Sequence, residues 1–204
     1  MTERDVAGLP VPYRLALAYA PAAARPAALA LLMLDDRLSR IVAGASEPLI
    51  AQIKLAWWRD QFAKPPPDWP RGEPLLAELR ACGFEGSDLG ALVDGWEAAG
   101  LAETVQDADV DSLADGRARA WSASALAPLS QGSRDAVAHA AHAWTAGECE
   151  RHAAAEKPGT PLPRSHRTLA VLAALGRRAC QRRQPMLDGP AALALAMRVG
   201  IFGR

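Results

Sequence analysis

Apolar residues recur along the chain at helical spacing, and no stretch alternates between apolar and polar residues as a half-buried strand would. Alanine and leucine dominate the apolar positions and β-branched residues are sparse, a combination that favours helices. Prolines and serines punctuate the pattern where helices are expected to begin or end. The pattern therefore predicts an all-α protein, with residues 1–204 forming a single helical domain.

Two segments show the pattern most clearly. From Pro26 to about Val42, one helical face is apolar, made by Leu29, Leu32, Met33, Leu38 and Ile41. A second helix is predicted after Ser46, its N-cap candidate, and must end before the prolines at 65–67. The buried stripe predicted for this second helix consists of Leu49, Ile50, Ile53, Trp57 and Trp58.

The remaining helices are less sharply bounded. One helix is predicted to start at Pro74 and another at Ser87. Four more are predicted to cover about Val105 to Leu126, Ser133 to His152, Ser165 to Gln181 and Pro190 to Val199. A proline-rich connection at 157–163 separates the last two from the rest.

Composition limits the classes of function. Lys and Arg number 23 and Asp and Glu also 23, so no excess of cations points to nucleic acid, and no nucleic-acid partner is expected. Three cysteines are too few for a disulfide framework and indicate a reducing compartment. The longest apolar run, Ala27 to Leu34, is too short to span a membrane, and no signal peptide is evident. We therefore expect a cytoplasmic protein, with peripheral contact to a membrane left open.

Charge is unevenly distributed along the chain. Nine acidic residues and no Lys or Arg lie between Glu85 and Gly116, whereas eight arginines and one aspartate follow from Arg164 onward. We favour the interpretation of two solvated faces that attract one another within the domain. The alternative is an acidic mouth that binds cations, beside an arginine patch for a diphosphate or for anionic lipid head groups.

Two segments resemble the squalene/phytoene synthase family. Residues 12–21, leading into 25–32, are similar to the family's opening helix and to the start of its first catalytic helix. Residues 46–60, which end in Trp57-Trp58-Arg59-Asp60, are similar to a stretch of the family's divergent bacterial and mitochondrial branch. A weaker similarity lies at 91–95. The resemblance covers about residues 10–120 and continues faintly to Pro163.

The resemblance implies an isoprenoid-synthase-like helical bundle around a central cavity, shortened at the C-terminus. Active members of the family join two isoprenyl diphosphates head to head, with magnesium held by two aspartate-rich motifs. That chemistry requires paired carboxylates on facing helices to bind Mg²⁺ and a deep apolar channel that keeps water from the carbocation.

The first of these motifs is degenerate in this sequence. Asp35 and Asp36 are the candidate metal ligands, but the residues four positions later are Ser39 and Arg40. By alignment with the family, the aspartates belong at Ser39 and Arg40 themselves. Neither register provides a carboxylate pair, and a guanidinium repels a metal ion. We interpret Asp35 and Asp36 as a solvated helix face, with Arg40 as a partner.

The second motif is incomplete. Counting back from Pro163, the resemblance places the pair near Glu150 and Ala154, so only one carboxylate is present. Asp94, three residues before Glu97 on a predicted helix, is a further candidate for a cation, although an exposed acid is the simpler interpretation. Glu150, like Asp94, is therefore only a candidate catalytic residue. No cofactor is expected unless the protein is active, in which case it would use Mg²⁺.

The predicted ligand cavity would be lined by Ser39, Arg40, Trp57 and Trp58. Trp57 and Trp58 are adjacent and point about 100° apart on a helix, so one of them is free to face the cavity or a partner. Packing in the core is the favoured interpretation for both rings.

Two functions follow from the resemblance. The favoured one is a protein that lacks Mg-dependent prenyl transfer and acts as an isoprenoid- or lipid-binding protein, or like the assembly factors of respiratory complex I found in the divergent branch. Its partners would be an isoprenoid diphosphate or lipid, or a respiratory-complex or membrane partner. The alternative is an active head-to-head prenyl diphosphate transferase of carotenoid- or squalene-type biosynthesis, with carboxylates drawn from Asp35, Asp36, Asp94 and Glu150.

Overall fold

The structure, a computed structural model, describes residues 6–45, 47–102, 104–123, 125–150 and 161–203, and within these ranges it is α-helical without a strand. The helices are α2 (Val11–Leu17), α3 (Arg25–Ala43), α4 (Pro48–Phe62), α5 (Pro74–Ala81), α6 (Gly86–Leu101), α7 (Asp107–Trp121), α8 (Gln131–Glu148), α9 (Arg167–Arg182) and α10 (Gly189–Phe202). Two 3₁₀ turns occur at Pro66–Asp68 and Arg164–His166. The predicted all-α class is confirmed.

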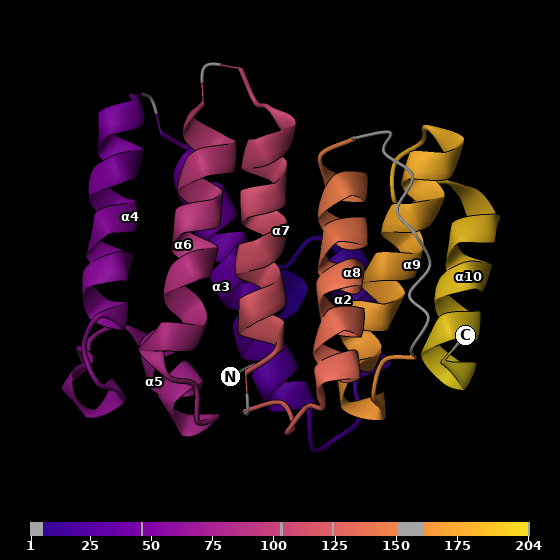
Figure 1. Ribbon diagram of the computed structural model, residues 1–204, viewed down its shortest axis with the longest axis horizontal. Coiled ribbons are helices and arrows are strands. Elements are labelled where there is room, and N and C mark those ends of the chain that lie inside the picture. Colours follow the sequence, from indigo (N-terminus) through magenta and orange to yellow (C-terminus); the bar gives the residue numbers. More distant parts are fainter. Residues whose placement is uncertain (1–5, 46, 103, 124, 151–160, 204) are drawn as a thin grey trace.

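The helices form two layers. In Figure 1, helices α4, α6, α7, α8, α9 and α10 stand side by side in one row, and each packs against the next. Helices α2 and α3 lie behind this row, where α3 contacts α4, α5 and α6 and α2 contacts α9. Helices α4 and α10 therefore form the two edges of the row, and the interior lies between the row and the pair behind it.

Local sequence explains where the helices begin. Proline occupies the first turn of α2, α3, α4, α5 and α10, where its missing N–H has no intrahelical partner to lose. Capping boxes open α6 from Glu85 and α7 from Gln106. The helix starts predicted at Ser87 and Ser133 are late by a few residues, because Glu85 and Ser130 occupy the N-cap positions of α6 and α8. Ser46 lies outside the described residues.

The stripe predicted to be buried on α4 is largely exposed. Leu49, Ile50, Ile53 and Trp57 face solvent, with exposed fractions of 40–63%. The residues that α4 buries against α3 and α6 are Ala51, Leu55, Trp58, Gln61 and Phe62. The prediction was wrong for four of its five residues because α4 is an edge helix with neighbours on one side only. An apolar strip from Leu49 to Trp57, about two and a half turns long, is left uncovered.

The predicted attraction between the acidic and the arginine-rich segments is not realised as contact. The acidic residues lie on α6 and α7, the arginines lie on α9 and α10, and α8 stands between the two pairs of helices (Figure 1). Across the described ranges, no salt bridge joins the two segments. The arginine-rich edge therefore keeps its positive charge.

Glycines allow the helices of the row to approach closely. A Cβ atom added to Gly176 on α9 would lie 2.1 Å from the carbonyl oxygen of Ala143 on α8, and one added to Gly147 would lie 2.3 Å from Gly176 Cα. Gly116 packs α7 onto α6 in the same way, with 2.4 Å to the carbonyl oxygen of Ala91. Gly116 therefore does not interrupt the predicted helix but serves its packing.

We predict that Gly176→Ala lowers the free energy of unfolding by about 1–3 kcal/mol, because the added methyl group meets backbone atoms that cannot rotate away. Urea denaturation followed by circular dichroism measures the change. Gly90→Ala on α6 is the matched control, since a Cβ there meets nothing within 4 Å. This control should keep or raise the stability. Equal stability of the two variants would contradict the role assigned to Gly176.

Candidate functional site

An ion pair is buried in the interior where α7 faces α3. Arg117 of α7 and Asp35 of α3 are 1% and 2% exposed. The guanidinium binds the carboxylate through two parallel hydrogen bonds, Nε to Oδ1 at 3.0 Å and Nη2 to Oδ2 at 2.8 Å. This bidentate geometry is the strongest form of arginine–carboxylate recognition.

Three further side chains complete the polar contacts of this pair. Glu148, at the end of α8, places Oε2 2.6 Å from Arg117 Nη2, and Thr145 accepts a hydrogen bond from Nη1 at 3.1 Å. The hydroxyl of Tyr13 on α2 lies 2.6 Å from Asp35 Oδ2 and 2.9 Å from Glu148 Oε1, so its single proton is available to either carboxylate. We call these five residues the central polar cluster.

Two tryptophans enclose the cluster. Trp96 of α6 donates its indole N–H to Asp35 Oδ1 at 3.1 Å. The guanidinium carbon of Arg117 lies 3.8 Å from the ring centre of Trp144 and 5.4 Å from that of Trp96. Cation–π attraction at these distances stabilises the buried charge and excludes water from it.

The protonation states follow from this environment. Burial raises the pKa of Tyr13 well above its usual value, and the carboxylates of Asp35 and Glu148 raise it further, so the phenol remains a hydrogen-bond donor. Burial alone would lower the pKa of Arg117, but Asp35 and Glu148 more than offset this and hold the pKa well above its usual value. The guanidinium stays charged at any physiological pH.

In the cluster, one carboxylate from α3 and one from α8 both contact the same guanidinium. Asp35 on α3 and Glu148 on α8 both contact Nη2 of Arg117, which takes the position between them. Mg²⁺ binds to oxygen ligands in a near-octahedral shell, and a guanidinium offers no acceptor. The donor set therefore does not fit Mg²⁺ while Arg117 is in place. Within the described residues, no group of three or more His, Cys, Asp or Glu is arranged to hold a metal ion.

Asp35 and Asp36 have different roles. Asp35 is buried, so its interpretation as part of a solvated face was wrong: α3 turns it toward Arg117 of a helix far away in sequence. Asp36 pairs with Arg40 at 2.8 Å, as predicted. Partial burial raises the pKa of Asp36, and Arg40 counteracts part of that effect. The two neighbouring aspartates do not act as a pair.

The positions that the family alignment assigned to aspartates lie one turn further along α3. Ser39 is half-buried and Arg40 is exposed, where it binds Asp36 and also donates to the carbonyl oxygen of Gly8. Neither side chain contacts Arg117 or Glu148 in the polar interactions of the cluster. They lie toward the surface rather than in the central polar cluster.

Asp94 serves to join α6 to α4. Arg59 of α4 binds Asp94 at 2.8 Å through Nε and also binds Glu97 through Nη2. Hydrogen bonds to Glu97 and Asp94 raise the pKa of Arg59. Asp94 also borders an open depression of about 500 Å³ between α6 and α7, together with Asp111, Asp115 and Arg119. The predicted candidate is thus an exposed ion-pair partner on the outer face of the row.

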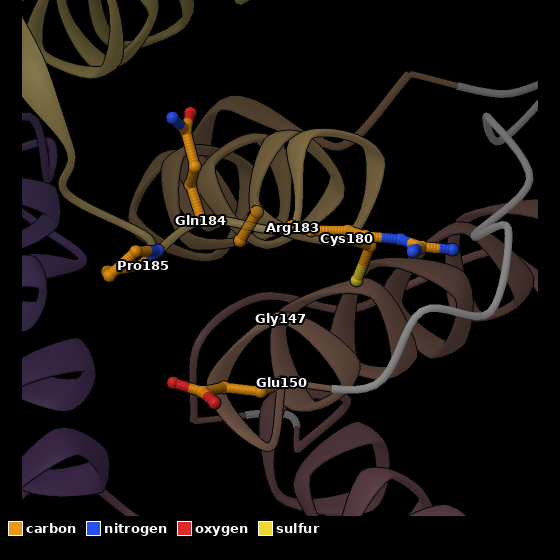
Figure 2. A pocket seen from close by; sticks show the side chains of 7 residues that line it. Gly147, Glu150, Cys180, Arg183, Gln184 and Pro185 are labelled. Atoms are coloured by element: carbon orange, nitrogen blue, oxygen red, sulfur yellow. The ribbon is translucent and has the colours of Figure 1, made fainter.

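Glu150 lies beyond the end of α8 and outside the cluster. It borders a pocket of about 80 Å³, which is small against the roughly 300 Å³ of ligand-binding pockets. Figure 2 shows Glu150 on one side of this pocket and Cys180 and Arg183 of the α9 end on the other. Glu148, two residues earlier, supplies the carboxylate that reaches the interior.

The two adjacent tryptophans separate as their helical angle requires. Trp58 is buried beside Phe62, with ring centres 5.7 Å apart, and it belongs to the core. Trp57 lies on the exposed strip of α4 and touches Trp58 edge-on at 5.1 Å. Neither ring takes part in the central polar cluster.

Sequence reasoning missed Arg117, Tyr13, Thr145 and Glu148. A signal for Arg117 is present, because it lies four residues after Leu113 and four before Trp121, on the apolar stripe of α7. Asp35 occupies the same kind of position, four residues after Leu31 and three before Leu38. A charged residue on an apolar stripe indicates a buried partner of opposite sign.

Comparison with protein families matches residues 12–115, about half of the chain, to squalene/phytoene synthase. The matched part includes Tyr13 and Asp35 and ends before Arg117 and Glu148. No curated protein and no solved structure matches the chain.

We predict that Arg117→Ala lowers the free energy of unfolding by about 3–5 kcal/mol, because Asp35 is left buried without its counter-ion. Arg117→Lys should recover only part of this loss, since an ammonium cannot make the bidentate contact. Urea denaturation of purified variants measures both effects.

Arg59→Ala is the matched control for this prediction. Arg59 also pairs with two carboxylates, but its side chain is 40% exposed. Its loss should lower stability by no more than about 1 kcal/mol. If Arg117→Ala were no more harmful than Arg59→Ala, the central polar cluster would not be the main polar support of the interior.

Proposed function

Because the chain belongs to the squalene/phytoene synthase family, we propose that it is a member without Mg-dependent prenyl transfer that acts by docking to a partner, like an assembly factor. The observation that carries this proposal is the guanidinium of Arg117 held between Asp35 and Glu148. Departure of a diphosphate requires metal ions that neutralise its negative charges, and carboxylates bind these ions. In this chain the guanidinium of Arg117 already neutralises the two carboxylates.

The positions of the other candidate carboxylates support the proposal. Asp36 is paired with Arg40, Asp94 with Arg59, and Glu150 borders a separate small pocket. An active transferase would need at least two of them to converge on a shared ion beside an apolar channel. In the described residues they point to different parts of the molecule.

Docking is favoured over the binding of an isoprenoid inside the bundle. Between α3, α6, α7 and α8 the interior is filled by the packed side chains of Arg117, Trp96 and Trp144. The outside offers the strip of Leu49, Ile50, Ile53 and Trp57 on α4, which is apolar and uncovered. A strip of this kind on an edge helix is typical of a protein–protein contact.

We expect no condensed product when the purified protein is incubated with Mg²⁺ and radiolabelled farnesyl or geranylgeranyl diphosphate. An active member of the family, assayed under the same conditions, is the positive control. The unfolding temperature should also be unchanged by Mg²⁺ and the diphosphate together, since ligands that bind the folded state raise it. A labelled hydrocarbon would establish the alternative, a working prenyl diphosphate transferase.

We expect Ile53→Glu to abolish the recovery of a respiratory-complex or membrane partner when the tagged protein is purified from its native host. Gln52→Glu is the matched control, because it adds the same charge at the neighbouring exposed position outside the strip. Ile53 is 63% exposed, so folding should be unaffected. Recovery of the same partners with wild type and Ile53→Glu would contradict docking through α4.

A further inference from the structure

The outer face of α10 is apolar and uncovered. Leu193, Met197 and Ile201 follow one another at intervals of four residues, and Phe202 ends the helix; these side chains are 47–69% exposed. The opposite face buries Ala192, Ala196 and Val199. The helix is therefore apolar on both faces, although it stands at the edge of the row with α9 on one side (Figure 1). A helix that is apolar all round is normally buried.

This edge of the molecule is strongly cationic. The segment from residue 161 to 203 contains seven arginines and a single acidic residue, Asp188. Arg198 is exposed on α10 itself, and Arg182 and Arg183 are exposed where α9 leads into it. Among the described residues these three arginines have no carboxylate partner. Arg198 thus adds an unneutralised positive charge to the helix that carries the uncovered apolar face, and Arg182 and Arg183 add two at the end of the preceding helix.

We propose that α10 docks the protein onto an anionic membrane surface, with Leu193, Met197, Ile201 and Phe202 at the acyl boundary and the neighbouring arginines on lipid phosphates. Apolar burial and attraction to anionic lipids are the two contributions that hold helices in the membrane interface. With 14 residues, α10 is about 21 Å long, against a hydrocarbon core of roughly 30 Å. No helix in the described part of the chain is long and apolar enough to cross a membrane.

The positive charge near α10 favours an anionic membrane over a second copy of the chain as the partner of this helix. Pairing two copies through α10 would bring two identical arginine-rich edges together, whereas anionic lipids attract that edge. Charge also distinguishes α10 from α4: the exposed strip of α4 is flanked by an acid and a base, Asp60 and Lys54, while the outer face of α10 carries no acid. The inference is independent of the docking proposed for α4.

Sedimentation with vesicles tests the inference on the full chain. We expect the protein to bind vesicles of phosphatidylcholine containing phosphatidylglycerol at least about tenfold more tightly than vesicles of phosphatidylcholine alone. Ile201→Glu should weaken this binding about tenfold or more, because it removes apolar contact and adds an acid. Arg198→Ala should weaken binding to the anionic vesicles severalfold and leave the neutral vesicles unaffected.

Ile53→Glu on α4 is the matched control, since it makes the same substitution at a similarly exposed isoleucine on the other edge. It should bind vesicles like wild type, so that failure of membrane docking and failure of α4 docking are separable. Equal binding of wild type to both kinds of vesicle would overturn the inference. So would unchanged binding by Ile201→Glu, or a dimer in analytical ultracentrifugation that Ile201→Glu abolishes.

Discussion

The packing of the interior depends on the charge of Arg117. Because this cation is buried, the helices around it must supply the groups that compensate its charge. Its guanidinium binds Asp35, Thr145 and Glu148, and it lies against the rings of Trp96 and Trp144. These partners come from α3, α6 and α8, so the arginine specifies how four helices meet. A buried cation without a partner is costly, and few other arrangements of the helices would satisfy it.

The same interaction is the basis for proposing that this chain lacks the Mg-dependent chemistry of its family. A metal ion between facing acidic helices can be exchanged and can bind a diphosphate. The guanidinium of Arg117 is attached to α7 and cannot leave, and its hydrogen bonds to Asp35 and Glu148 use carboxylate oxygens that are then not available to a metal ion. A catalytic centre and a structural ion pair thus place opposite demands on the same carboxylates.

The two edges of the helical row carry similar apolar strips in different charged surroundings, and we propose different partners for them for this reason. On α4 the strip is flanked by Asp60 and Lys54, whose charges are opposite. On α10 it is accompanied by arginines that no carboxylate neutralises among the described residues. Apolar area supplies affinity in both cases, whereas the surrounding charge decides whether an anionic lipid surface is attracted or repelled.

Helical periodicity, prolines and the segments at 12–21 and 46–60 were sufficient to predict the all-α class, most of the helix bounds and the family. They determined these features because they act within a few residues along the chain. Tertiary packing alone decided that the stripe of Leu49, Ile53 and Trp57 faces solvent, since exposure depends on whether another helix covers that side. It also decided that Asp35 meets Arg117, because the energy of a buried charge depends on a partner 82 residues away that no local pattern identifies.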